Sequence, residues 1–305
     1  MIIEVNYMDI TKYEVLLKVV DRGGLSQSAE DLGYTRSALS KMIASMEKEI
    51  GFPLVKRTRK GIVLNEEGER VVPLIRELLK VNTILEEEYL MIRGMSQGKL
   101  RIGSFPTMAY LLMPDILKGF NEIHPGIQIE VVEEHSLHQL ETWLKQGIID
   151  VALFSRESYH EFDWIPFMEE PYVALIPKAC TLAEKEVISV EEMFDHKLIL
   201  FKTQEGYDQD MMKFQEITAG TKEADYNTNS IYLVQKMVAY DNCVSIIPLS
   251  VAEDTAKWFP VEFRKLNTEV KRTIGFAVKH KENVSLTLRE FLRYVKKARQ
   301  MYIGK

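Results

Sequence analysis

The sequence predicts an α/β protein with a small helical N-terminal part and a larger part in which strands and helices alternate. Its 305 residues suffice for about two domains, at roughly 150 residues per domain. Residues 1–65 show short helical patterns joined by tight turns. Beyond Gly98, strand and helix patterns alternate in two successive runs, which indicates parallel sheets covered by helices. The two runs predict two lobes with a cleft between them.

The composition is that of a soluble globular protein, with 46% apolar and 28% charged residues. No apolar run approaches the roughly 18 residues of a membrane span, and residues 1–21 lack the basic start of a signal peptide. Cys180 and Cys243 suit a reducing compartment, so we expect a cytoplasmic protein. The net charge of −6 argues against a uniformly basic binder of nucleic acid or membranes. It leaves room for a local basic patch.

Three short helices are expected in the first 51 residues. The first has apolar residues on one face and ends at Gly23-Gly24. The second runs from about Ser26, a suitable N-cap, to Leu32. The third is capped by Thr35 and ended by Gly51. The inward faces of the first and third helices are Tyr13, Leu16, Leu17 and Val20, and Leu39, Met42, Ile43 and Met46.

A small hairpin and a long helix follow. The hairpin has expected strands at 54–56 and 62–64, and Asn65 caps a helix over 66–93 that Pro73 is expected to kink. Apolar residues at 3–4 spacing form a seam on this helix, which favours a dimer contact over packing within its own domain. The seam residues are Val71, Leu74, Leu78, Val81, Leu85 and Ile92.

The larger part begins after a linker at 94–98. Helices are expected at 107–123, 137–146, 207–218, 230–240 and 285–302, with a capping box at Ser189 to Glu192. Strands are expected at 100–103, 127–132, 150–154, 172–176, 198–201, 244–247 and 273–278.

The sharpest chemical pattern lies between Leu25 and Arg57. Small residues in one short helix, a tight turn and a polar face on the next helix have the make-up of a helix-turn-helix, whose second helix enters the major groove. The hairpin tip carries four positive charges in five residues, which suits a DNA-contacting wing, whereas the alternative is a solvated turn. The polar face comprises Arg36, Ser37, Ser40 and Lys41, and the tip comprises Lys56, Arg57, Arg59 and Lys60.

At these residues the chain resembles the LysR-type transcriptional regulators. The motifs are Ser37-Ala38-Leu39-Ser40 with Ile43 and Glu47, Gly51-x-Pro53-Leu54-x-x-Arg57, Leu64-Asn65-x-x-Gly68, and the segment Gly98–Gly103. The resemblance covers essentially the whole chain. It implies a winged helix-turn-helix DNA-binding domain (1–65), a linker and dimerisation helix (66–93), and a two-lobed effector-binding domain (94–305) like periplasmic solute-binding proteins. Lobe I would comprise about 98–165 and 272–305, and lobe II about 166–271.

The resemblance also implies partners. Such proteins bind pseudo-palindromic, double-stranded promoter DNA as homodimers or homotetramers, and a small-molecule effector in the cleft changes their geometry. RNA polymerase is a further expected partner if the protein is an activator. No catalytic or metal site and no cofactor are expected. The predicted DNA-binding residues are Ser26, Gln27, Thr35, Arg36, Ser37, Ser40, Lys41, Lys56, Arg57, Arg59 and Lys60.

Two departures from the family pattern bear on these sites. Arg36 stands where the family usually has glutamine, and an arginine can read guanine through O6 and N7. Asp241 and Cys243 replace a common Gly-x-Gly, which puts the shape of one cleft wall in question.

The predicted effector site lies at strand–helix junctions that face the cleft. The start of the helix after Gly103 favours an anion, and Arg156 and Lys202 can pair with a carboxylate. The alternative is that Ser104 and Thr107 merely cap this helix. The predicted residues are Ser104, Phe105, Pro106, Thr107, Glu134, His135, Ser155, Lys202, Thr203, Asn229, Ile247 and Pro248.

Other readings of the chain stay open at this stage. His135 and His138 beside Glu133 and Glu134 form a weak metal-site pattern, and the two cysteines are a conceivable redox pair. A binding protein or enzyme on the same scaffold, with residues 1–93 as a dimerisation module, is an alternative function. A structural DNA-binding protein without an effector is another, disfavoured by the large cleft-forming domain. The sequence contains no G-x-S-x-G, H-E-x-x-H, Walker A or G-x-G-x-x-G motif.

Overall fold

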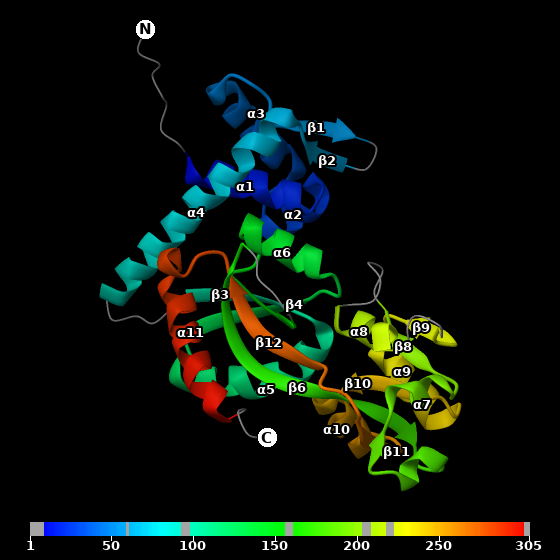
Figure 1. Ribbon diagram of the computed structural model, residues 1–305. Coiled ribbons are helices and arrows are strands. Elements are labelled where there is room, and N and C mark those ends of the chain that lie inside the picture. Colours follow the sequence, from blue (N-terminus) through cyan, green and yellow to red (C-terminus); the bar gives the residue numbers. More distant parts are fainter. Residues whose placement is uncertain are drawn as a thin grey trace. The chain divides into compact units, whose positions relative to one another are not determined.

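A computed structural model describes residues 9–58, 61–92, 98–155, 161–202, 209–217 and 223–301. The chain divides into two compact units, Met1–Met95 and Ser96–Lys305 (Figure 1). The first unit holds a helix-turn-helix and a hairpin, and the second is a two-lobed α/β structure, which confirms the predicted fold class. None of the helices in the described parts of the chain combines the length and apolar character needed to cross a membrane.

The first unit packs three helices, a hairpin and the start of a long helix around one apolar core. Its elements are α1 (Ile10–Asp21), α2 (Leu25–Leu32), α3 (Arg36–Ile50), β1 (Val55–Thr58), β2 (Gly61–Leu64) and α4 (Glu66–Ile92). Leu16 of α1, Leu39 of α3 and Leu54 before β1 are fully buried in this core. Figure 1 shows α4 leaving the bundle as one long helix, which continues through Pro73.

Local signals place the ends of these helices. The Thr35 side chain accepts a hydrogen bond from the Ala38 amide (3.1 Å), and Gly51 ends α3 with a φ of 89°. Asn65 caps α4 by accepting from the Gly68 amide (2.8 Å). These caps confirm the predictions, whereas the predicted cap of α2 was wrong. Gly24 is its N-cap, because extended backbone there starts the helix at Leu25 and leaves Ser26 inside the first turn.

The second unit is built on one large, strongly curved sheet. Its strand order is β4-β3-β5-β12-β6-β11-β7, with β10 also paired to β6. Strands β4, β3 and β5 run parallel, whereas β12 is antiparallel to both β5 and β6. The strands are β3 (Gly98–Ser104), β4 (Ile127–Glu133), β5 (Val151–Ser155), β6 (Asp163–Pro177), β7 (Val187–Ile188), β10 (Ser245–Pro248), β11 (Val261–Leu266) and β12 (Lys271–Val278).

Strand β6 passes through both lobes as one continuous strand (Figure 1). Its residues 163–171 pair with β12, and its residues 172–177 pair with β10 and β11. The sequence pattern predicted only its second half, because Pro166, Glu169 and Glu170 interrupt the apolar run of the first half. The lobes are therefore joined by paired strands within one sheet.

Helices cover each lobe and enclose separate cores. Lobe I carries α5 (Pro106–Ile123), α6 (Leu137–Gln146) and α11 (Leu286–Ala298). Lobe II carries α7 (Val190–Phe194), α8 (Gln209–Ile217), α9 (Ile231–Tyr240), α10 (Leu249–Trp258) and the parallel pair β8 (Ile199–Phe201) and β9 (Tyr226–Thr228). Phe120, Phe276 and Phe291 form the aromatic centre of lobe I. Helix α10 and strands β9 and β11 were missed by the sequence pattern.

Candidate DNA-binding face and ligand cleft

The helix-turn-helix is held together by small buried residues, as its sequence predicted. Ser28 of α2 is fully buried, and its hydroxyl donates to the carbonyls of Lys18 (3.1 Å) and Gly24 (2.7 Å). Ala29 beside it is also buried. A larger side chain at either position would push α2 off α1. The turn to α3 is made at Gly33, whose φ is 69°.

The polar face of α3 is exposed over its first two turns. Arg36, Ser37 and Lys41 are exposed, and Ser40 is half-buried. Ser26 and Gln27 are exposed in the first turn of α2. The Thr35 hydroxyl oxygen accepts the capping hydrogen bond of α3. The hydroxyl can still donate its proton to a partner.

The hairpin is fixed to α3 by side-chain hydrogen bonds. Arg57 Nη2 donates to Ser40 Oγ (3.2 Å), and the Glu47 carboxylate accepts from the backbone amides of Leu54 (2.7 Å) and Val55 (3.1 Å). Lys56 and Arg57 are exposed on β1. Arg59 and Lys60 lie outside the described residues. These hydrogen bonds connect α3 and the described part of the hairpin.

Two acidic side chains of this unit are neutralised by neighbouring cations. Asp31 lies 3.0 Å from Lys18 and 2.8 Å from Arg22, and the hydrogen bond from Lys18, with that from Arg22, lowers the pKa of Asp31. The hydrogen bond from Lys12 likewise lowers the pKa of Glu49. The cations of these pairs are Lys12, Lys18 and Arg22. The exposed cations of α3 and β1 take no part in them.

On lobe I, the predicted effector residues meet where three parallel strands end. Ser104 at the end of β3 is in register with Glu133 of β4 and Leu153 of β5. The segments 104–107, 134–135 and residue Ser155 therefore lie together. Ligands of α/β sheets bind at such carboxyl ends.

On lobe II, β8 and β9 bring Lys202 and Asn229 close together. Phe201 is in register with Thr228, and the Lys202 amide donates to the Thr228 carbonyl (2.8 Å). The two lobes approach each other here, because the rings of His135 and Phe201 are 6.5 Å apart. Thr203 and Arg156 lie outside the described residues.

Three predicted effector residues have structural roles that occupy their side chains. The Ser104 hydroxyl is buried and donates to the Phe105 carbonyl (3.0 Å). The Glu134 carboxylate accepts from the amides of His135 (2.7 Å) and Ser136 (3.0 Å). Ile247 is buried in the core of lobe II. By contrast, no side chain caps the start of α5, where Phe105, Pro106 and Thr107 lie.

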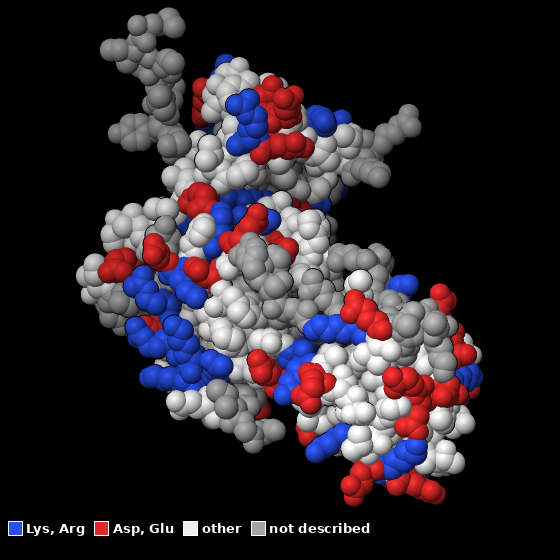
Figure 2. All heavy atoms as spheres, in the orientation of Figure 1, with Lys and Arg blue, Asp and Glu red and all other residues white. Residues whose placement is uncertain are grey.

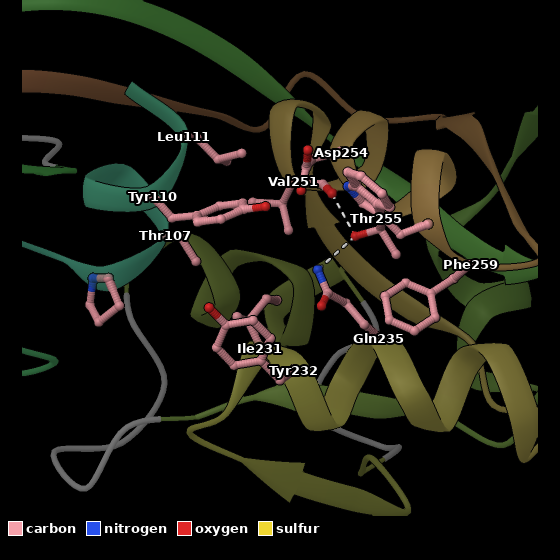
Figure 3. Close-up of a pocket in the computed structure, with 12 residues that line it drawn as sticks. Thr107, Tyr110, Leu111, Ile231, Tyr232, Gln235, Val251, Asp254, Thr255 and Phe259 are labelled. Carbon is pink, nitrogen blue, oxygen red and sulfur yellow. Dashed lines mark hydrogen bonds between the residues drawn. The ribbon is translucent and has the colours of Figure 1, made fainter. Parts of the chain in front are cut away.

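A cavity of about 390 Å³ lies among α5, α9 and α10 (Figure 3). Only two of its residues, Pro106 and Thr107, were predicted as site residues. The others come from helices that the fold brings together, and α10 was not predicted at all. The remaining lining residues are Tyr110, Leu111, Ile231, Tyr232, Gln235, Val251, Asp254, Thr255, Trp258 and Phe259.

The other reactive groups form no further centre in the described parts of the chain. No group of three or more His, Cys, Asp or Glu side chains there is arranged to hold a metal ion. Cys243 is fully buried, and burial raises the pKa of its thiol.

In Figure 2, positive side chains gather over α11, whose exposed basic residues are Arg289, Arg293, Lys296 and Lys297.

Comparisons with known proteins assign both units to one family. The model of the bacterial regulatory helix-turn-helix protein, lysR family, matches residues 10–69, and that of the LysR substrate binding domain matches residues 93–300. The probable HTH-type transcriptional regulator LrrA of Synechococcus elongatus is 32% identical over 170 residues, which cover 56% of this chain and 58% of LrrA. YvbU of Bacillus subtilis, an uncharacterized HTH-type transcriptional regulator, is 24% identical over 95% of this chain and 98% of its own.

Solved structures share the fold. A full-length OxyR from Pseudomonas aeruginosa aligns with a TM-score of 0.74 at 20% identity, over 95% of each chain. The LysR-family regulator CbnR, solved with its target DNA, aligns with a TM-score of 0.66 at 17% identity, over 95% of this chain and 100% of CbnR. A helix-turn-helix unit and a two-lobed α/β unit on one chain define a DNA-binding regulator with its own ligand domain. This chain belongs to the LysR family of bacterial transcriptional regulators.

Proposed function

We propose that this protein regulates transcription by placing α3 in the major groove of promoter DNA, with the wing on the adjacent backbone. The observation that carries this is the surface formed by the exposed face of α3 and the strand β1, which the hydrogen bond from Arg57 to Ser40 connects. Arg36 and Ser37 lie in the first turn of α3, the part of a recognition helix that meets base edges. The remaining predicted residues contact phosphates: Ser26, Gln27, Thr35, Ser40, Lys41, Lys56, Arg57, Arg59 and Lys60.

The division of labour is tested by comparing two variants on specific and random DNA. The DNA upstream of the protein's own gene is the first specific probe, and genome-wide selection of bound fragments supplies others. Arg36→Ala is expected to reduce discrimination between cognate and random DNA by about 1–3 kcal/mol, the worth of a bidentate base contact. Lys56→Ala is expected to weaken binding to both DNAs alike and to reduce the salt slope by about 1.

A matched control comes from the far end of the same helix. Lys48 is exposed in the last turn of α3, so Lys48→Ala should leave both affinities unchanged. If Arg36→Ala lowers affinity equally for cognate and random DNA, Arg36 does not read bases.

We propose that the protein pairs with a second copy through α4. Within the described residues, an apolar stripe runs along this helix at 3–4 spacing and is exposed: Leu74 at 68%, Val81 at 60%, Leu85 at 46% and Ile92 at 77%. Tyr89 extends the stripe and was not predicted, whereas Val71 packs on the core of its own unit and Leu78 is half-buried. Two copies would read half-sites about one helical turn or a multiple of it apart.

We propose that a small anionic effector binds between the two lobes. The uncapped start of α5 supplies a positive dipole, and Lys202 supplies a positive charge from the opposite lobe. His135, Ser155, Asn229 and Pro248 complete the proposed site, together with Thr203. A thermal-shift screen of small carboxylates against the full chain tests this, with Lys202→Ala as the variant. The effector found should stabilise the protein and alter its gel-shift pattern, and Lys202→Ala should weaken its binding.

A further inference from the structure

The cavity among α5, α9 and α10 has the make-up of a small-molecule site. Its volume of about 390 Å³ falls within the roughly 300–1,000 Å³ of ligand pockets. Its rim is aromatic and open to solvent, because Tyr110, Tyr232 and Trp258 are 54%, 66% and 72% exposed. Its floor is buried and contains Val251, Gln235 and Thr255.

Gln235 and Thr255 place a fixed hydrogen-bond acceptor in this floor. Gln235 is only 8% exposed, and its amide nitrogen donates to Thr255 Oγ1 (2.8 Å). That hydroxyl in turn donates to the Val251 carbonyl (2.6 Å). The chain of bonds fixes the Gln235 amide so that its carbonyl oxygen points away from Thr255 on the pocket side (Figure 3).

The Gln235 carbonyl oxygen receives no hydrogen bond from another described residue and stays accessible at the cavity wall. Because the rest of this side chain is buried and held by Thr255, the oxygen is a fixed acceptor that a ligand can reach. A bound molecule that presents an N–H or O–H group would satisfy this oxygen.

The lining residues carry one ionisable charge, and it is negative. Asp254 contributes a carboxylate that is 19% exposed. Two lysines lie beside the lining without belonging to it. Lys257 Nζ is 3.6 Å from the Asp254 carboxylate but largely solvated, and Lys236 Nζ lies over the Phe259 ring at 4.9 Å. Aromatic faces beside a carboxylate attract an ammonium group.

We propose that this cavity binds a small organic molecule with a protonated primary amine on an apolar, preferably aromatic, skeleton. The ammonium donates to the Asp254 carboxylate and to the Gln235 carbonyl oxygen, and the skeleton lies between Tyr110, Tyr232 and Trp258. This cavity also lies between the lobes, because α5 belongs to lobe I and α9 and α10 belong to lobe II. It shares Pro106 and Thr107 with the anion site proposed above, but its ionisable group is Asp254, so it takes the opposite charge.

The test measures binding of three probes to the full chain by isothermal titration calorimetry. Phenethylamine carries the proposed charge, 2-phenylethanol is its neutral analogue, and phenylacetate carries the opposite charge. We expect saturable binding of phenethylamine, weaker binding of 2-phenylethanol and none of phenylacetate. Asp254→Asn should weaken phenethylamine binding about tenfold, the value of one charge-assisted hydrogen bond.

A matched control lies one residue away on the same helix. Glu253 is exposed and does not line the cavity, so Glu253→Gln should bind phenethylamine like the unmodified protein. Circular dichroism and the gel shift report folding and DNA binding separately, so failure of this proposal is distinguishable from failure of the DNA-binding one.

Three results would overturn the proposal. They are the absence of saturable phenethylamine binding, equal binding by Asp254→Asn, and preference for phenylacetate. A fourth concerns a second copy of the chain as the occupant. If Trp258→Ala lowers the oligomeric state in sedimentation experiments while phenethylamine binds to neither protein, the aromatic rim is a protein–protein surface.

Discussion

The proposed DNA-binding face and the proposed ligand sites of this protein are built in different ways. The described residues of the DNA-binding face come from one stretch, residues 26–57, and most are exposed side chains on α2, α3 and β1. The ligand sites collect side chains from segments that are far apart, such as the start of α5, the ends of β8 and β9, and the helices α9 and α10. The first kind of site can be predicted from helix periodicity. The second kind can be predicted only when the order of the strands and the packing of the helices are known.

The difference also appears in what holds each site in place. The DNA-binding face depends on caps and on side-chain to backbone hydrogen bonds, such as those that Glu47 accepts. In the second unit, a buried ion pair between Glu170 of β6 and Arg272 of β12 lies where the strands pass from one lobe to the other. The other Glu170 oxygen accepts from the Ser250 amide (2.8 Å) in the first turn of α10. Three substitutions and one chemical treatment, ordered by expected effect, test this comparison.

The largest effect is expected for Glu170→Ala in the second unit. Removing one partner of a buried ion pair costs about 3–5 kcal/mol, because the remaining charge is less well compensated in a low-dielectric site. The free energy of unfolding is measured by urea titration with intrinsic fluorescence. Glu290→Ala breaks the exposed pair with Arg293 and should cost at most about 1 kcal/mol. Equal losses for the two variants would contradict a special role for the buried pair.

The next effect is expected for Leu85→Asp on α4. The substitution places a charge in the proposed dimer contact and removes about 1.5 kcal/mol or more of apolar burial from each copy. The dimer dissociation constant, measured by sedimentation equilibrium, should rise about 100-fold. Thr83→Asp places the same charge on the opposite side of the helix, since successive residues are rotated by about 100°, and should leave the dimer intact. If Thr83→Asp disrupts the dimer equally, the stripe is not the contact.

A smaller effect is expected for Gly68→Ala, which distinguishes packing from helix propensity. A Cβ at position 68 would overlap the Leu54 carbonyl oxygen, a backbone atom that cannot move away easily. We expect a loss of about 1–3 kcal/mol in the stability of the DNA-binding unit, although alanine is the better helix former. Thermal unfolding measures the change. Gly24→Ala has open space and extended backbone, and it should change stability by only a few tenths of a kcal/mol. A gain in stability for Gly68→Ala would show that the backbone around Leu54 moves to make room for the added Cβ.

The smallest effect is expected from hydrogen peroxide on Cys243. Peroxide attacks thiolates, whereas burial raises the pKa of Cys243 and keeps it a thiol. Mass spectrometry should find Cys243 unmodified in the folded protein after peroxide treatment, and modified once urea exposes it. A rapid disulfide between Cys180 and Cys243 in the folded protein would refute this.

Much of the DNA-binding unit was determined by the sequence alone. Thr35, Gly51 and Asn65 act as caps through bonds to residues within four positions, so a local pattern suffices to predict them. The buried face of α3 follows from the 3.6-residue period in the same way. On α1 the structure buries Val15 and Val19 fully, and the predicted Tyr13 and Val20 only in part. Ser26 is not the N-cap of α2, because the helix starts two residues earlier, with Gly24 at the N-cap position. Local patterns place helix ends only to within a residue or two.

The tertiary structure decided which residues come together in the proposed ligand sites. The lobes are joined through β6, whose first half has no clear apolar pattern, so the sequence could not show that one strand serves both lobes. Ser104 and Ile247 were chosen by their position at strand ends, yet both are buried with their side chains engaged. Gln235 and Thr255 meet across 20 residues through the packing of α9 on α10. Such contacts depend on which elements pack together. The apolar surface buried over the whole unit determines this packing, so no single segment reveals it.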